Sequence, residues 1–119
     1  MAGRFPLLTD IDVDGRLVRG LVRVGWDVVR VVDTFPGDTL DNVLFEQAVE
    51  QNQAFVTNDK GIHRIGAEWI RKGQTFRTVF WAKQHHDRMT IGQFIEVFEE
   101  IAAKENPFAY PIEYITPRS

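Results

Sequence analysis

The sequence predicts an α/β domain, a three-layer sandwich around a mainly parallel sheet of at least four strands. Short apolar runs alternate four times with segments of helical hydrophobic spacing. This repetition favours parallel strands joined by right-handed crossovers. The 119 residues suit one domain, and a hydrophobic content of 44% is enough for a small core.

The first half of the chain predicts two strands, each followed by a helix. A short apolar strand covers residues 5–9, and the next helix has Asp14 as its N-cap and Gly25 as its stop. Valine-rich residues 26–32 predict a buried strand, because β-branched side chains suit a pleated surface. A second helix over about 40–51 follows a Pro-Gly turn.

The second half repeats the same alternation. We expect a strand at 54–57, a helix from 62 to a stop at 73, and a strand at 76–82. The last helix begins with a capping box, in which Thr90 and Gln93 satisfy each other's backbone N–H groups.

These elements place a single domain at 1–106, and residues 107–119 form a C-terminal extension packed on it. Aromatic and apolar residues alternate in the extension, but Pro107, Pro111 and Pro117 limit its pairing. An edge strand or a docked segment is therefore expected rather than a central strand.

The composition excludes several classes of protein. The chain has no cysteine, so disulfide scaffolds, thiolate zinc sites and cysteine nucleophiles are ruled out. Its apolar runs are too short to span a bilayer, and the N-terminus lacks the pattern of a signal peptide, so we expect a cytoplasmic protein that does not interact with membranes. A net charge of −3 does not favour nucleic-acid binding, although local charge matters more than the total.

Four aspartates are the candidate site residues. Asp10 and Asp12 follow the first predicted strand, Asp41 opens a helix, and Asp59 follows the third strand. The carboxyl ends of parallel strands share one sheet edge, where such folds bind ligands. Carboxylates from separate loops can hold Mg²⁺ or Mn²⁺, which prefer hard oxygen ligands.

Each aspartate also has a purely structural interpretation. Asp41 can stabilise the N-terminus of its helix, and Asp12 and Asp14 can both act as caps. We expect His63 to face solvent and the three tryptophans to fill the core. Basic residues after the third and fourth strands are candidates for a positive rim near the acidic centre: Arg64, Arg71, Lys72, Arg77, Lys83, His85, His86 and Arg88.

The order of these motifs resembles a known family. The segments Leu7–Asp10, Gly25–Val29, Asp41–Leu44 and Ala54–Lys60 are similar to the opening strand, second strand, acidic helix start and Thr-x-Asp-Lys strand of PIN-like domains. These small domains are found among prokaryotic toxin-antitoxin systems. The resemblance covers roughly residues 5–100.

The resemblance implies a Mg²⁺- or Mn²⁺-dependent ribonuclease that acts as a toxin. Asp10, Asp41 and Asp59 would be its catalytic and metal-binding carboxylates, Asp12 a supporting ligand, and Lys60 a contact to substrate phosphate. RNA is the implied substrate, and an antitoxin protein or a second copy of the chain are partners that it leaves open.

Three alternatives stay open. Gly61 stands where many PIN-like domains have a fourth acid, which allows a catalytically inert module that only binds a partner. The segment from Asp12 to Leu17 is similar to the signature of haloacid dehalogenase-type phosphatases, although Arg16 replaces the usual threonine. The third alternative is a non-enzymatic receiver-like module, because the acids after the first strand and the Asp after the third strand resemble a phospho-acceptor site. That fold needs a fifth βα unit and a lysine after its last strand, and we expect the chain to supply neither.

Overall fold

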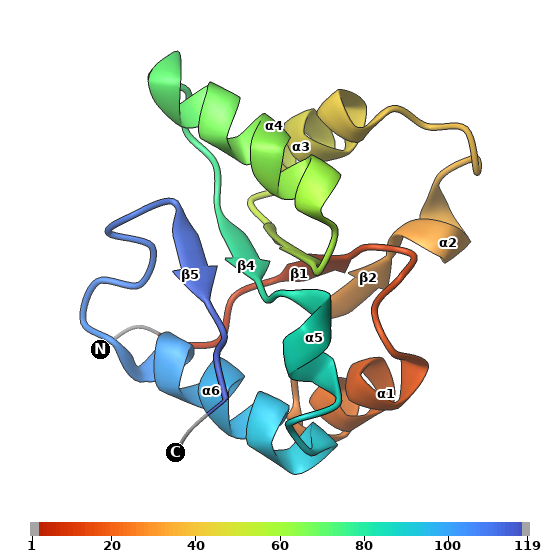
Figure 1. Cartoon of the computed structure of the whole chain (residues 1–119), viewed down its shortest axis with the longest axis vertical. Helices are drawn as coiled ribbons and strands as arrows, with labels where there is room; N and C mark the ends of the chain where they lie inside the picture. Colours follow the sequence, from red (N-terminus) through yellow and green to blue (C-terminus); the bar gives the residue numbers. More distant parts are fainter. Residues whose placement is uncertain (1–2, 118–119) are drawn as a thin grey trace.

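The computed structural model describes residues 3–117 as a parallel sheet with helices on both faces (Figure 1). The predicted three-layer α/β fold is confirmed. All five strands are parallel, in the order β2-β1-β3-β4-β5. This is the flavodoxin-like order of doubly wound sheets. The strands are β1 (Leu7–Thr9), β2 (Val28–Arg30), β3 (Ala54–Thr57), β4 (Thr78–Phe80) and β5 (Ile112–Tyr114).

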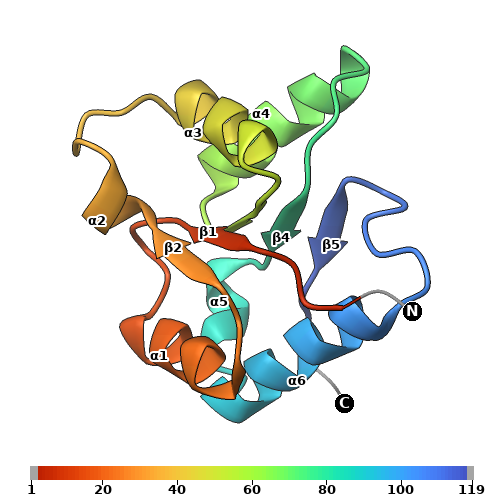
Figure 2. The same ribbon diagram turned by 180° about the vertical axis from the view of Figure 1, so that it is seen from behind.

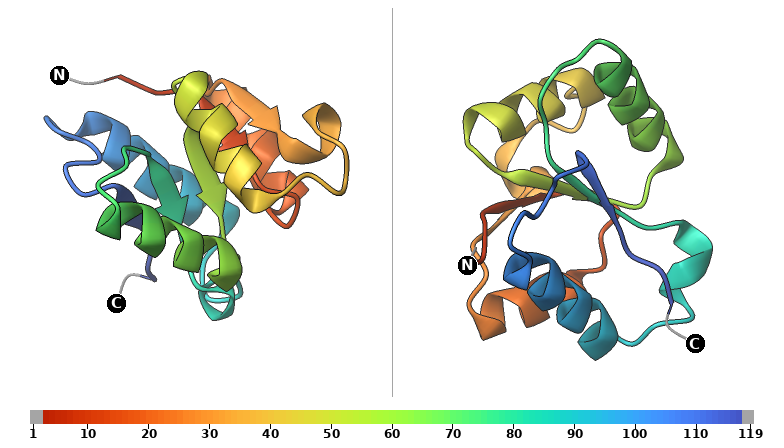
Figure 3. Two further views of the ribbon diagram at one scale, coloured as in Figure 1. Left: turned by 90° about the horizontal axis from the view of Figure 1, so that it is seen from above. Right: turned by 90° about the vertical axis from the view of Figure 1, so that its left-hand side faces the viewer.

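The helices form the two outer layers (Figures 2 and 3). One face carries α1 (Gly15–Val24) and α6 (Ile91–Ala103), and the other carries α3 (Asp41–Glu50) and α4 (Lys60–Arg71). Two short helices, α2 (Val31–Thr34) and α5 (Lys83–His86), lie in the connections. Within residues 3–117, no helix has the length and apolar character needed to cross a membrane.

Each face of the sheet has its own apolar core. Trp81, Phe94 and Phe98 are buried between the sheet and the α1/α6 layer. Phe45 and Phe55 are buried on the α3/α4 side. Strands buried on both faces are expected to consist almost entirely of apolar residues, as β1 and β3 do. The tryptophan prediction holds for Trp26 and Trp81, whereas Trp69 is half-buried against Phe45 and Phe76.

The helix boundaries follow the predicted capping residues. Asp14 accepts the backbone N–H of Arg16 at the start of α1, and Gly25 ends α1 in the left-handed conformation with φ of 112°. Only glycine adopts that conformation without a steric cost. Thr90 and Gln93 form the complete capping box at the start of α6.

Replacement of Thr90 by alanine is expected to lower the free energy of unfolding by about 1 kcal/mol. The substitution leaves the backbone N–H of Gln93 without the hydroxyl that it now meets at 3.1 Å. Urea denaturation measures the change. Thr75→Ala, in an exposed loop, is the matched control and is expected to stay within about 0.5 kcal/mol of the parent. Equal losses for the two variants would contradict the role of the capping box.

The second strand differs from its prediction. The sequence predicted a buried strand over 26–32, but β2 covers only Val28–Arg30 and its three residues are half-buried. The physical reason is its place at the edge of the sheet, where it pairs with β1 alone. Val31 then turns inward and begins α2.

The C-terminal extension forms the fifth strand, one of the two placements expected for it, and within residues 3–117 no helix follows this strand to complete a fifth βα unit. β5 pairs in parallel with β4 and forms the other edge of the sheet, as expected for a segment limited by prolines. Glu113 anchors it, because its carboxylate meets Lys104 Nζ at 2.6 Å and accepts the N–H of Phe108. No lysine stands at 115–117. Residues 1–2 and 118–119, at the ends of the two predicted segments, lie outside the described residues.

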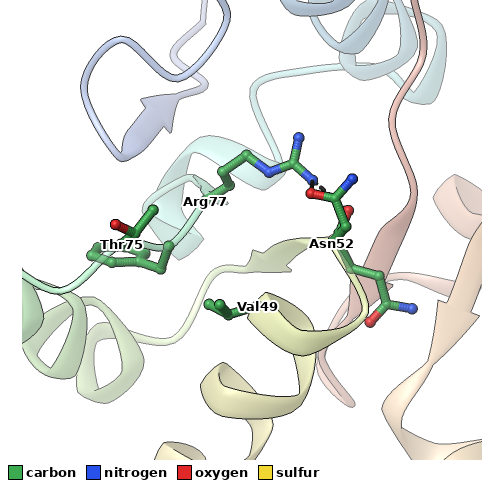
Figure 4. A pocket seen from close by; sticks show the side chains of 6 residues that line it. Val49, Asn52, Thr75 and Arg77 are labelled. Carbon is green, nitrogen blue, oxygen red and sulfur yellow. Dashed lines mark hydrogen bonds between the residues drawn. The ribbon is translucent and has the colours of Figure 1, made fainter.

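Arg77 contacts three distant segments at the N-terminal edge of the sheet, and Figure 4 shows its contact with Asn52. Its guanidinium lies 5.7 Å from the ring centre of Phe5 and 5.6 Å from that of Phe108, and it donates to the backbone carbonyl and side chain of Asn52. It borders a cavity of about 220 Å³. The predicted positive rim is therefore wrong for Arg77, which precedes β4, and for Arg71 and Lys72 at the end of α4.

Candidate active site

The topology of the sheet brings the candidate residues to its C-terminal edge. The chain passes from β1 to β2 on one side and then crosses back over β1 to enter β3 on the other side. The crevice between β1 and β3 is thus the topological switch point, where doubly wound sheets bind ligands. Asp10 follows β1 directly, and Asp59 follows β3 after Asn58.

Asp10 lies at the centre of this crevice and is 7% exposed. Its Oδ1 accepts the backbone N–H of Ile11 at 2.8 Å, and its Oδ2 accepts the hydroxyl of Thr57 at 2.8 Å. Thr57 also accepts the N–H of Asp59 at 3.1 Å. The hydroxyl therefore links the ends of β1 and β3 and fixes the orientation of the Asp10 carboxylate.

The charge of Asp59 affects the pKa values of both Asp10 and Asp41. Burial raises the pKa of Asp10 above its ordinary value, against its two hydrogen bonds, and the carboxylates of Asp12 and Asp59 raise it further. Burial also raises the pKa of Asp41, and Asp59 again adds to the shift. Asp10, Asp41 and Asp59 therefore share one region of negative potential, where a bound cation is favoured.

Asp10 and Asp41 line the same cavity, which has a volume of about 260 Å³. Asp41 is the first residue of α3, as predicted. The remaining wall is largely apolar and comes from α2, α3 and the loops beside them: Ile11, Val31, Val32, Phe35, Pro36, Gly37, Thr39 and Leu44. The site therefore combines carboxylates with an apolar side.

Asp59 has a structural role as it stands. It is the N-cap of α4, and its Oδ1 accepts the backbone N–H of Gly61 at 2.7 Å. A Cβ atom at position 61 would lie 3.1 Å from that same oxygen. A side chain at position 61 would therefore require the Asp59 carboxylate to shift by a few tenths of an ångström.

Asp12 lines a different cavity from the one that Asp10 and Asp41 share. This cavity of about 430 Å³ is lined by Asp12, Asp14, Asn58, Lys83, His86 and Asp87. Lys83 Nζ lies 4.0 Å from Asp12 Oδ2. Asn58 is buried, and its Oδ1 has no hydrogen-bond partner within residues 3–117. Lys60, the predicted phosphate contact, opens α4 next to Asp59 and is exposed.

The sequence did not assign Thr57 and Asn58 to the site, and it placed Lys83 only in the positive rim around it. A signal for Thr57 was present, because a threonine two residues before Asp59 recurs in the Thr-x-Asp-Lys motif. Lys83 begins α5, a short helix in a segment expected to be a polar loop, so its side chain could not be placed in advance. Asn58 lines the Asp12 cavity because of the order of the strands in the sheet, and nothing in the neighbouring sequence indicates this position.

The metal-ligand set is not assembled as the side chains stand. Within residues 3–117, no three histidine, aspartate or glutamate side chains are grouped closely enough to hold a metal ion. Comparisons of the chain with protein-family models, curated proteins and solved structures each found no match. The chemical assignment therefore rests on the residues and their geometry.

His86 connects this edge of the sheet to α1. Its Nε2 lies 3.3 Å from Asp14 Oδ2, and its ring packs against Phe94. Asp14 also pairs with Arg16 at 2.7 Å. Hydrogen bonds from the Arg16 side chain and backbone lower the pKa of Asp14 to about 2, and the charge of His86 adds a smaller effect.

Asp14→Asn is expected to change how stability depends on pH between about pH 4 and pH 2. The folded pKa of Asp14 lies below its ordinary value of 3.8. The ionised carboxylate therefore stabilises the parent above that pH, and this contribution is lost as the pH falls through about 2. An asparagine side chain can still cap the N-terminus of α1, but it carries no charge.

Urea midpoints of the parent and Asp14→Asn across this range measure the effect. The parent is expected to lead by less than about 1 kcal/mol near pH 5, since Arg16 is exposed, and the lead should vanish towards pH 2. A pH-independent difference would contradict the assignment.

Proposed function

We propose that this chain is a metal-dependent endoribonuclease of the PIN-like kind that acts as the toxin of a toxin-antitoxin pair. The observation that carries the proposal is the placement of Asp10 and Asp59 at the ends of the two strands that flank the topological switch point, with Asp41 in the same cavity as Asp10. The charge of Asp59 adds to the raised pKa values of Asp10 and Asp41. A divalent cation relieves the repulsion among such carboxylates, and Mg²⁺ or Mn²⁺ suits an all-oxygen ligand set.

In this proposal, Asp10, Asp41 and Asp59 bind the ion, and Asp12 supports them. The chemistry that the ion supplies when bound is polarisation of a phosphoryl oxygen and a lowered pKa of a bound water. Thr57 holds the Asp10 carboxylate in position through its hydroxyl. Lys60 binds substrate phosphate as an exposed point charge at the start of α4.

Asp59 takes part through its second oxygen or by a turn of its carboxylate. Its Oδ1 now accepts the N–H of Gly61 at 2.7 Å. The buried Oδ1 of Asn58, which has no partner among the described residues, lies next to Asp59 in the chain and is a further oxygen for a cation or its water. Both features fit a site whose oxygen ligands come together only when the ion binds.

Incubation with a panel of RNAs in Mn²⁺ or Mg²⁺ tests the proposed activity. We expect endonucleolytic cleavage that EDTA abolishes and no hydrolysis of a generic phosphomonoester. Hydrolysis of the phosphomonoester alone would favour the haloacid dehalogenase-type alternative. Absence of both activities would contradict the proposal as a whole.

A partner-binding module without catalysis is the second candidate. Both oxygens of Asp10 and one of Asp59 are already hydrogen-bonded within the chain. Two apolar residues that line the Asp41 cavity are also exposed, Ile11 by 57% and Val32 by 47%, and exposed apolar side chains that lie together are typical of partner surfaces. An antitoxin or a second copy of the chain is the partner that this candidate requires.

Expression in bacteria separates the two candidates. A toxin is expected to arrest growth, and co-expression of a small neighbouring open reading frame is expected to restore it. Stable capture of that neighbour by the chain, without growth arrest or RNA cleavage, would favour the inert module.

A further inference from the structure

Three aromatic rings from three different elements meet at the same C-terminal edge of the sheet, next to the acidic site. His63 of α4 lies with its ring centre 4.6 Å from that of Phe80 at the end of β4. Its Nε2 and the hydroxyl of Tyr114, at the end of β5, are 2.8 Å apart. His63 was expected to face solvent, but these contacts make it half-buried. We call His63, Phe80 and Tyr114 the aromatic platform.

The three rings differ in exposure. Packing in the apolar core explains the position of Phe80 but not that of Tyr114. Phe80 is 8% exposed and fills the core under α4, whereas Tyr114 is 49% exposed. The Tyr114 ring is nevertheless held in place, because its hydroxyl meets His63 and its ring centre lies 6.1 Å from that of Phe80. A fixed and exposed aromatic ring offers a stacking surface at low entropic cost.

Tyr110 provides the comparison within the same segment. It is 53% exposed but has no hydrogen bond or ring contact within residues 3–117, and it precedes β5 by two residues. Both tyrosines are therefore exposed, but of the two, Tyr114 is the one whose ring is held in a fixed orientation.

The aromatic platform lies close to the proposed metal site. His63 is one helical turn along α4 from Asp59, a rise of about 6 Å. Tyr114 is two inter-strand spacings from the end of β3, or about 10 Å. A polymeric ligand that is bound at Asp59 can therefore place its next monomer unit on Tyr114.

Positive charge lies on the same turn of α4. Lys60 and Arg64 are exposed and four residues apart, so they share one side of the helix with His63 between them in sequence. Neither forms an ion pair within the described part of the chain. Aromatic rings beside basic side chains are the combination by which proteins bind single-stranded nucleic acid.

We infer that the aromatic platform is a subsite for an unpaired base of single-stranded RNA, which stacks on Tyr114 while Lys60 and Arg64 contact the adjoining phosphates. The inference rests on the proposed ribonuclease function and specifies its substrate as single-stranded. Bases in a duplex are already stacked and cannot lie on a protein ring, so the platform selects against duplex RNA.

The test is the affinity for a fluorescently labelled 12-nucleotide oligouridine, measured by anisotropy in EDTA so that no cleavage occurs. Tyr114→Ala is expected to raise Kd about ten- to one-hundred-fold. Tyr114→Phe keeps the ring and is expected to raise it less than about fivefold. Tyr110→Ala is the matched control and should bind as the parent does.

Each outcome supports or overturns the inference. Parent-like binding by Tyr114→Ala, or equal losses in Tyr114→Ala and Tyr110→Ala, would overturn the stacking subsite and leave the ribonuclease proposal intact. An equal loss of affinity for a duplex of the same length would overturn the single-stranded assignment. Failure of the parent to bind or cleave any RNA would overturn the proposed function and the subsite together. Melting temperatures of the two alanine variants within a few degrees of the parent establish that both are folded.

Discussion

Asp10→Asn is expected to lower metal-dependent RNA cleavage by at least about a hundredfold and to leave the fold intact. Asp10 is the most buried of the proposed ligands, and its carboxylate is fixed by Ile11 and Thr57. Loss of its charge weakens an all-carboxylate site by several kcal/mol, and each 1.4 kcal/mol corresponds to a tenfold change. Initial rates in Mn²⁺ measure the effect, with Asp38→Asn, in an exposed turn, as the control.

The same variant is expected to be more stable than the parent at neutral pH, by about 0.5 to 2 kcal/mol. The folded pKa of Asp10 lies above its ordinary value of 3.8, so ionisation of this carboxylate opposes folding at higher pH. Asparagine removes the buried charge. Its oxygen can still accept the N–H of Ile11, and its amide can donate to Thr57.

The gain in stability is expected to shrink as the pH falls from the raised folded pKa of Asp10 towards 3.8, and to be lost below that value, where the parent carboxyl is protonated in both the folded and unfolded states. Urea denaturation at several pH values follows the difference between parent and variant. A variant that loses activity only because it unfolds would contradict the assignment of Asp10 as a ligand.

Arg77→Ala is expected to lower the free energy of unfolding by about 2 to 3 kcal/mol. The guanidinium lies against the rings of Phe5 and Phe108, each worth up to about 2 kcal/mol when partly desolvated, and it donates to the Asn52 carbonyl. These contributions are not additive, so the expected loss is smaller than their sum. Arg77→Lys is expected to recover less than half of the loss, because an ammonium lacks the planar fork.

Arg71→Ala is the control for this prediction. Arg71 is exposed, and its one ion pair among residues 3–117 is with Glu68 on the same helix turn, so its removal is expected to cost less than about 0.5 kcal/mol. RNA cleavage by Arg77→Ala at a temperature where it is folded should equal that of the parent, because Arg77 lies at the opposite edge of the sheet from Asp10. A stability loss for Arg77→Ala no larger than that for Arg71→Ala would contradict its joining role.

Local signals made most of the fold predictable. The caps at Asp14, Gly25 and Thr90 depend on residues only a few positions away, and all three occur where the sequence placed them. The fifth strand was harder to foresee, because β5 has three residues between prolines and its stability comes from pairing with β4, far along the chain. The partners of Arg77 are likewise distant in sequence.

The candidate site was predictable in its location but not in its side-chain orientations. Strand order alone brings Asp10 and Asp59 to one crevice. The hydrogen bond from Thr57 to Asp10 spans 47 positions and depends on the register of β1 against β3. The hydrogen bond by which Asp59 caps its own helix through the N–H of Gly61 was also not predicted, because Gly61 was interpreted only as a missing acid.

Calorimetric titration with Mn²⁺ tests the central claim most directly. The parent is compared with a double variant, Asp10→Asn with Asp59→Asn, which removes the two carboxylates that flank the β1/β3 crevice and keeps their shapes. We expect saturable binding to the parent and no saturable binding to the double variant. Equal binding in the two proteins would contradict a metal site at the switch point of the sheet.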